Sequence, residues 1–139
     1  MSRILEVNNL RVSFRQDGQV FPAVRDVSFA IERGETVALV GESGSGKSVT
    51  ALSTVSLLGE SAIVEGSVTY NGEEMVGTSE TALRKIRGYD ISFIFQEPMT
   101  SLNPLHTLEK QLAESLALHQ GLTGAAARAR IIGLLTKVR

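Results

Sequence analysis

The residues Gly41–Ser48 have the types and the spacing of a site that holds phosphate. They read Gly-Glu-Ser-Gly-Ser-Gly-Lys-Ser and fit the pattern G-x-x-x-x-G-K-[ST] at every specified position. Glycines allow the main chain to wrap closely around phosphate groups, and the amides of such a loop point at the anion. In this pattern the Lys47 ammonium reaches the β- and γ-phosphates, and the Ser48 hydroxyl ligates Mg²⁺.

Two other interpretations of these glycines are weaker. The dinucleotide pattern G-x-G-x-x-G has its short spacing first, whereas Gly41, Gly44 and Gly46 have it last, which disfavours a nicotinamide or flavin site. A plain connection between a strand and a helix would not need the complete pattern, including its Lys and Ser. The residues therefore predict a nucleotide-binding loop.

The apolar pattern predicts the elements that position this loop. The continuous run Thr36–Val40 is typical of a strand buried on both faces of a parallel sheet. Residues Lys47–Leu58 contain no Gly or Pro and carry apolar side chains at helical spacing, which predicts a helix. A second buried strand is expected at Ile91–Phe95.

The chain before Thr36 has the alternation of antiparallel strands. Leu10, Val12 and Phe14 share one strand face, and Asp17-Gly18 supplies a hairpin turn. The other elements expected before residue 90 are strands over 20–24, 27–32 and 64–70, a turn at Asn71-Gly72, and a short helix over 79–87 ended by Gly88.

After Asn103-Pro104 the pattern becomes helical. One stripe is formed by Leu108, Leu112 and Leu116, and a second follows the break at Gly121, with Ala127, Ile131, Leu134 or Leu135, and Val138. The pattern has no capping signal at Arg139, which predicts a truncation there. We expect an α/β fold, with an antiparallel β subdomain and a P-loop NTPase core over 1–97 and the start of a helical subdomain over 98–139.

Composition excludes several classes of protein. The chain has 139 residues and no Cys, so cysteine-ligated metal sites are excluded. Its net charge of −1 gives no field that would attract nucleic acid, which is not expected as a partner. No apolar run approaches the roughly 20 residues of a membrane span, and the apolar pattern at the N-terminus breaks too early for a signal peptide. These features predict a cytoplasmic protein.

Residues around the loop carry a family resemblance. The blocks Ala23–Phe29, Arg33–Thr36 and Phe93–Met99 resemble the nucleotide-binding subunits of ATP-binding cassette (ABC) transporters. Within that family, Gly41–Ser48 together with Gln96–Pro104 is similar to the bacterial oligopeptide and dipeptide importer branch. The resemblance covers essentially the whole chain and implies a truncated ABC ATPase domain.

The resemblance also implies an activity and a set of partners. It implies that ATP and Mg²⁺ are bound, and that the full-length parent hydrolyses ATP to power import of peptides or similar small solutes. The implied partners are transmembrane permease subunits, a second ATP-binding subunit or cassette, and indirectly a solute-binding protein. The protein would then lie on the inner face of the cell membrane, held there through the permease.

Particular residues receive roles from this resemblance. Gln96 corresponds to the Q-loop glutamine, which contacts Mg²⁺ and the attacking water, so Lys47 and Gln96 are the catalytic candidates, and Ser48 and Gln96 the metal candidates. Phe14 stands where the family places an aromatic ring against adenine; the weaker alternative is a core residue that continues the face of Leu10 and Val12. The implied nucleotide contacts are Phe14, Val24, Gly41, Glu42, Ser43, Gly44, Ser45, Gly46, Lys47, Ser48 and Val49.

Three family motifs are missing from the sequence: the Leu-Ser-Gly-Gly-Gln signature, a hydrophobic strand ending in Asp-Glu, and a switch histidine after a strand. Glu97 follows a glutamine rather than an aspartate and is not assigned as the catalytic base. His106 and His119 follow no strand, so we expect them at the surface or between helices. Residues 1–139 are therefore expected to bind nucleotide without appreciable turnover.

Some surfaces and rival functions stay open at this point. The apolar faces of Ile91–Phe95 and Leu108–Leu116 are expected to lack cover, and Met99 and Leu102 either dock a permease helix or pack on the α/β core. A P-loop phosphotransferase is one rival, but it would need an Arg-rich lid, and the one close arginine pair after the loop, Arg128 and Arg130, lies in an Ala-rich helical pattern. An ABC ATPase without a permease is another, but it would bring heptad insertions, zinc cysteines or basic patches.

Overall fold

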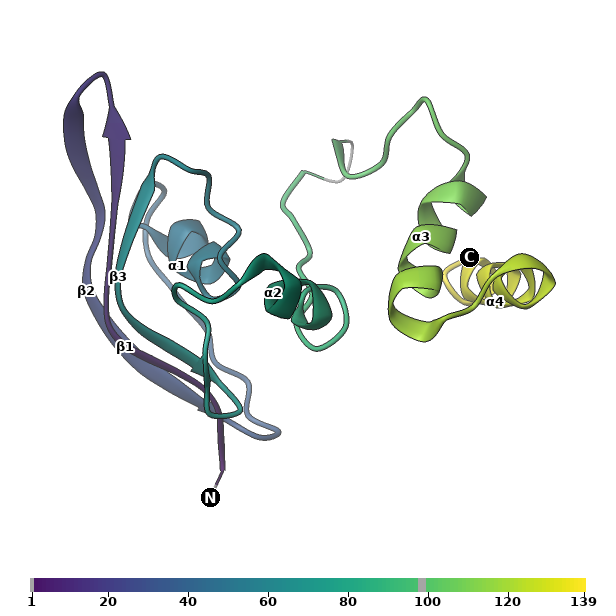
Figure 1. Cartoon of the computed structure of the whole chain (residues 1–139), viewed down its shortest axis with the longest axis horizontal. Helices are drawn as coiled ribbons and strands as arrows, with labels where there is room; N and C mark the ends of the chain where they lie inside the picture. Colours follow the sequence, from purple (N-terminus) through teal and green to yellow (C-terminus); the bar gives the residue numbers. More distant parts are fainter. Residues whose placement is uncertain (1, 98–99) are drawn as a thin grey trace. The chain divides into compact units, whose positions relative to one another are not determined.

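The computed structural model describes residues 2–97 and 100–139 (Figure 1). Met99, one of the two residues expected at a docking surface, lies outside these ranges. The chain divides after Leu83 into two compact units, which are described separately below. Their elements are β1 (Arg3–Gln16), β2 (Gln19–Glu32), α1 (Lys47–Ser53), β3 (Ala62–Tyr70), β4 (Glu73–Glu74), α2 (Glu80–Ile86), α3 (Leu108–Gln120) and α4 (Gly124–Lys137).

The first unit is built on an antiparallel sheet with the strand order β2-β1-β3-β4 (Figure 1). Asp17 and Gly18 have φ angles of 51° and 76°, and Gln16 pairs with Gln19, which is the geometry of a two-residue hairpin with the right twist for its strands. The predicted hairpin is confirmed. The two strands expected at 20–24 and 27–32 form one continuous strand, β2.

One face of this sheet forms the core of the first unit. Val7, Leu10, Val12 and Val68 are completely buried. Leu10 and Val12 alternate as the sequence predicts, and an irregularity in β1 near Asn9 brings Val7 onto the same face. This face packs against α1 and the segment that follows it, where Val55 is also completely buried.

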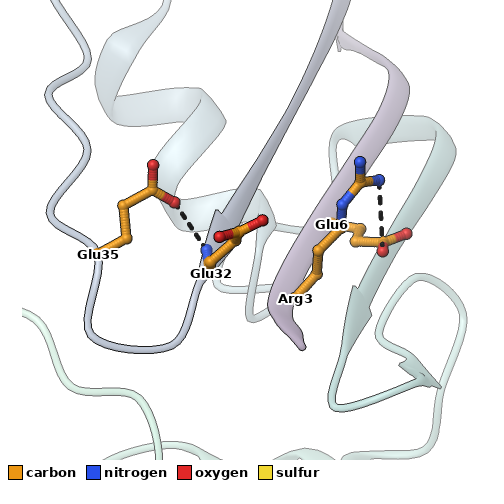
Figure 2. A network of polar contacts seen from close by, with 4 residues as sticks. All are labelled: Arg3, Glu6, Glu32 and Glu35. Carbon is orange, nitrogen blue, oxygen red and sulfur yellow. Dashed lines mark hydrogen bonds and ion pairs between the residues drawn. The ribbon is translucent and has the colours of Figure 1, made fainter. Parts of the chain in front are cut away.

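A tight turn ends β2. The Glu35 amide donates to the Glu32 carbonyl oxygen (3.1 Å), and the Glu35 carboxylate accepts a hydrogen bond from the Glu32 amide (2.8 Å; Figure 2). The neighbouring Arg3–Glu6 ion pair, 3.6 Å long, is exposed and adds little stability (Figure 2). This turn directs the chain towards the glycine-rich loop.

Neither predicted buried strand forms. Residues 36–40 are extended but unpaired, and Val40 is 85% exposed; at 91–95, Ile94 is fully exposed and only Ile91 makes an isolated bridge, to Arg87. A parallel strand needs hydrogen-bonding neighbours on its edges. The described residues supply none for these two runs, so their apolar side chains are not covered.

Helix α1 is shorter than predicted, because it ends at Ser53 rather than Leu58. The Ser53 and Thr54 hydroxyls donate back to the carbonyl oxygens of Thr50 and Ala51, at 2.7 and 2.6 Å. Such bonds compete with continuation of the helix. Ser56 then adopts a positive φ of 55°, which a helix does not allow.

The second unit contains a pair of packed helices whose core is formed by Leu116, Ala127 and Ile131. Helix α3 begins after Thr107, whose side chain accepts a hydrogen bond from the Lys110 amide, and ends at Gly121 with φ 66°. The predicted stripes are confirmed at Leu116, Ala127 and Ile131, with half-buried Leu134 rather than the exposed Leu135 beside them. The prediction is wrong at Val138, which follows the end of α4 and is 80% exposed. Leu116 is covered by α4, so the expectation of an uncovered face over Leu108–Leu116 is correct only near Leu108, which is 48% exposed.

Candidate functional site

The predicted phosphate loop is an open bend that runs directly into α1. Gly46 precedes the helix with a φ of 95°, a conformation that favours glycine. A Cβ at Gly46 would lie 2.9 Å from the Ala23 carbonyl oxygen, and one at Gly41 would lie 2.6 Å from Ser45 Oγ. The approach to a main-chain oxygen and the positive φ explain why glycine is needed at Gly46, whereas the contact at Gly41 is with a side-chain hydroxyl.

The Lys47 ammonium lies inside this bend. Its Nζ donates to the carbonyl oxygens of Gly41 (2.6 Å) and Glu42 (2.7 Å) and lies 3.3 Å from Ser45 Oγ. The loop's own carbonyl oxygens therefore hold a positive charge in its centre. An anion with several oxygens is the ligand that this arrangement favours.

Main-chain amides add donors to the cradle. The Ser45 and Thr50 amides are used within the fold, since they donate to the carbonyl oxygens of Glu42 and Gly46. By contrast, within residues 2–97 and 100–139 the amides of Gly46, Lys47 and Ser48 have no acceptor. Unpaired amides at the start of a helix, next to an ammonium group, fit a phosphate tail.

A cavity of about 410 Å³ adjoins the loop and the strand that packs on it. It is lined by Pro22–Val27 from β2 and by Gly44, Ser45 and Thr50 from the loop and α1. Val24 is 5% exposed. Its Cγ2 would lie 3.4 Å from a Cβ added at Gly46, so Val24 packs against the loop. A volume of this size is within the range of small-molecule sites.

The other predicted site residues divide between the two units. Phe14 is half-buried on the core face of β1, Val49 is half-buried in α1, and Ser48 is exposed in the first turn of that helix. All predicted nucleotide contacts therefore belong to the first unit. Gln96 belongs to the second unit, where it is exposed at a bend that follows the stacked rings of Phe93 and Phe95.

The histidines have the surroundings expected of surface and packing residues. His119 is half-buried and stacks on Tyr89, with ring centroids 5.9 Å apart. His106 is exposed, and its Nδ1 lies 3.3 Å from Lys110 Nζ. Glu97 is exposed as well.

Sequence reasoning did not single out one half-exposed aromatic residue of the first hairpin, Phe21. It is directly opposite Phe14 in the hairpin. The signal was present, because a two-residue turn at Asp17-Gly18 pairs Gln16 with Gln19 and thereby, two residues further along each strand, Phe14 with Phe21.

With this geometry established, the chain was compared with known proteins. Residues 24–139 match the family model described as ABC transporter. The chain belongs to the ABC transporter family. The family resemblance is thereby confirmed, and the match favours an ABC ATPase over the phosphotransferase alternative.

Curated ABC relatives are similar over almost the entire chain. The chain is 53% identical to the uncharacterized ABC transporter ATP-binding protein YejF of Escherichia coli K12, over 97% of this chain and 26% of that protein. It is 54% identical to the peptidoglycan transport ATP-binding protein YejF of Agrobacterium fabrum, over 97% and 25%. It is 48% identical to the oligopeptide transport ATP-binding protein OppD of Mycobacterium tuberculosis, over 99% and 23%. The chain thus spans about a quarter of the length of these relatives.

A solved ABC structure shares the fold. The ATP-binding cassette MJ0796, in a dimeric post-hydrolysis state bound to ADP and Pi, aligns with a TM-score of 0.75 and 24% identity, over 95% of this chain and 56% of that one. The predicted fold class is confirmed as part of an ABC ATPase domain with an antiparallel β subdomain and helices. None of the helices in the described residues is long and apolar enough to cross a bilayer.

Proposed function

We propose that this chain binds the triphosphate of Mg²⁺-ATP in the loop Gly41–Ser48, as the ATP-binding part of an ABC importer for peptides. The arrangement that carries the proposal is the Lys47 ammonium held in the centre of a main-chain bend, beside the unpaired amides of Gly46 and Ser48. Glycine is needed at Gly46, where a side chain would meet the Ala23 carbonyl oxygen, so main chain rather than a side chain faces the ligand there.

Each polar group of the site has a role in this proposal. The Lys47 ammonium and the loop amides bind the phosphate oxygens and neutralise their charge. The Ser48 hydroxyl, exposed in the first turn of α1, would hold Mg²⁺, and the family resemblance makes the Gln96 amide a further metal candidate. When bound, Mg²⁺ supplies further charge neutralisation to the β- and γ-phosphates. Phe14 and Val24 provide the apolar side of the site, next to the sugar and base.

Peptides are proposed as cargo because of two relatives, OppD, which is named for oligopeptide transport, and the Agrobacterium YejF, named for peptidoglycan transport. Cell-wall muropeptides and oligopeptides both contain peptide bonds, so a peptide is the class they share. The partners in this proposal are permease subunits, through which the protein lies on the inner face of the membrane, a second ATP-binding subunit or cassette, and indirectly a solute-binding protein. Such names favour a transporter over a permease-free ABC ATPase.

Residues 1–139 alone are proposed to bind nucleotide without turning it over. They contain the cradle, but the sequence has no Asp-Glu strand, no signature motif and no switch histidine to position water and complete the site. Phosphoryl transfer depends on this positioning and on charge stabilisation. Binding and hydrolysis are therefore expected to separate in this chain.

Isothermal titration with Mg²⁺-ATP tests nucleotide binding. Lys47→Ala is expected to raise the Kd at least about tenfold, because a hydrogen bond to a charged group contributes about 1.5–3 kcal/mol. Lys85→Ala, which removes an exposed lysine from α2, is the matched control and should leave the Kd unchanged. Equal affinities for the unmodified chain and Lys47→Ala would contradict the site.

A phosphate-release assay on the same samples tests turnover. The unmodified chain and Lys47→Ala should release phosphate at the same background rate. Release by the unmodified chain that Lys47→Ala abolishes would contradict the proposal that residues 1–139 lack a complete hydrolytic site.

A further inference from the structure

The Lys47 ammonium has three hydrogen-bond acceptors, and all of them belong to its own loop. The carbonyl oxygens of Gly41 and Glu42 lie 2.6 and 2.7 Å from its Nζ, and the Ser45 hydroxyl oxygen lies 3.3 Å from it. An ammonium group carries three protons and therefore donates to three acceptors. The loop thus occupies the full donor capacity of this side chain.

Of the three acceptors, the Ser45 hydroxyl is bound most weakly. Its distance of 3.3 Å to Nζ is longer than a typical N–H···O bond, whereas the two carbonyl distances are short. The carbonyl oxygens are fixed by the main chain, but a serine hydroxyl moves away by rotation about one side-chain bond. Ser45 is therefore the acceptor that Lys47 exchanges at the smallest cost.

The local structure of the loop places the Ser45 hydroxyl beside the ammonium. The Ser45 amide donates to the Glu42 carbonyl oxygen (3.1 Å), which closes a turn within the loop. A Cβ at Gly41 would lie 2.6 Å from Ser45 Oγ, so the hydroxyl uses space that the absence of a side chain at Gly41 leaves free. Ser45 also lines the cavity that adjoins the loop. The residue thus contacts Lys47 and borders the cavity at the same time.

We infer that Ser45 lowers the affinity of the loop for phosphate, because its hydroxyl competes with a phosphate oxygen for one proton of the Lys47 ammonium. The inference rests on the proposed nucleotide function and adds to it a residue that adjusts affinity through a contact within the chain. A phosphate oxygen that binds Lys47 has to replace one of the three acceptors. When Ser45 is replaced, the two carbonyl oxygens still hold the ammonium in the loop. The lost Ser45 bond then reduces the net free energy of binding.

Isothermal titration of the 139-residue chain with Mg²⁺-ATP and with Mg²⁺-tripolyphosphate tests this competition. Ser45→Ala is expected to tighten the binding of both ligands about two- to fivefold, as the loss of a long and weak competing hydrogen bond implies. The gain should be equal for the two ligands, because the competition concerns phosphate oxygens only. Ser61→Ala removes an exposed hydroxyl of the same unit outside the loop and should leave both affinities unchanged.

A gain in affinity separates this role from a merely structural one, because damage to the loop weakens binding. Unchanged affinity in Ser45→Ala would overturn the inference and leave the phosphate site standing. Weaker binding by a Ser45→Ala protein with an unaltered circular dichroism spectrum would also overturn it, since the hydroxyl would then assist the ligand. If the unmodified chain bound neither ligand, the proposed function itself would fail, and the inference with it.

Two further variants show whether the effect passes through Lys47. Ser45→Thr keeps an acceptor hydroxyl and should keep the affinity of the unmodified chain. In the Lys47→Ala background the ammonium is absent, so adding Ser45→Ala should leave the weakened affinity unchanged. A gain in Ser45→Thr equal to that of Ser45→Ala, or a gain that persists without Lys47, would overturn the inference.

Discussion

The antiparallel sheet of the first unit and the apolar runs at 36–40 and 91–95 have similar apolar side chains, but only the side chains of the sheet are buried. Val68 in β3 is completely buried, whereas Val40 is 85% exposed and Ile94 is fully exposed. The two regions differ because the strands of the sheet have hydrogen-bonding neighbours. Strand β1 pairs with β2, across a two-residue turn, and with β3 on its other edge. Hydrophobicity alone therefore does not make a strand, because the main-chain groups also need neighbours.

A polar segment of the second unit supports the same conclusion. Residues 103–107 form no regular element, yet the Gln111 side chain accepts a hydrogen bond from the Asn103 amide (2.9 Å) and donates to the carbonyl oxygens of Asn103 (2.9 Å) and His106 (3.1 Å). One side chain in α3 thus satisfies several main-chain groups of the segment. Hydrogen-bond partners, and not apolar content, hold this segment in place.

The largest expected effect comes from the same substitution made in both contexts. Val68→Ala should lower the free energy of unfolding by about 2 kcal/mol, because it removes two buried carbons at about 0.8 kcal/mol each and leaves a small cavity. Val40→Ala should change it by less than about 0.5 kcal/mol. Urea unfolding followed by circular dichroism measures both. Equal losses would show that the run at 36–40 is packed as firmly as the sheet.

A smaller effect is expected for the Gln111 contacts. Gln111→Leu should lower the hydrogen-exchange protection of the Asn103 amide up to about tenfold, as loss of a hydrogen bond with a net contribution of about 1 kcal/mol implies. Gln120→Leu changes an exposed glutamine at the end of the same helix and should leave that protection unaltered. Retained protection in Gln111→Leu would show that other contacts hold the segment.

The smallest effect concerns Glu74, which ties the β3–β4 hairpin together. Burial raises the pKa of its carboxyl group, but hydrogen bonds from the Ser67 hydroxyl and from the amides of Val76, Val68 and Met75 outweigh this and lower it. Because the pKa is lower in the folded state, the stabilisation is present above the ordinary value of 4.5 and is lost as pH falls below it.

The urea midpoint of the unmodified chain should therefore decrease between about pH 5 and pH 3, and Glu74→Gln should show a smaller decrease. Glu73→Gln, a change at the neighbouring exposed residue, should follow the unmodified chain. A Glu74→Gln protein with the full pH dependence would show that this carboxylate does not stabilise the sheet.

The parts of the molecule that depend on nearby residues were predictable from the sequence. The hairpin at Asp17-Gly18, the helix stripes around Leu116 and Ile131, and the residue types of the loop at Gly41–Ser48 all follow from turn chemistry and periodicity within short windows. The family followed as well, because it is carried by contiguous motifs.

Only the tertiary structure decided what depends on residues distant in the chain. It left Thr36–Val40 unpaired and packed Gly46 against Ala23 and Val24 of β2. A local pattern specifies which conformations a segment can adopt, whereas burial and hydrogen-bond pairing depend on which other segments come within reach, and no short window of sequence contains that information.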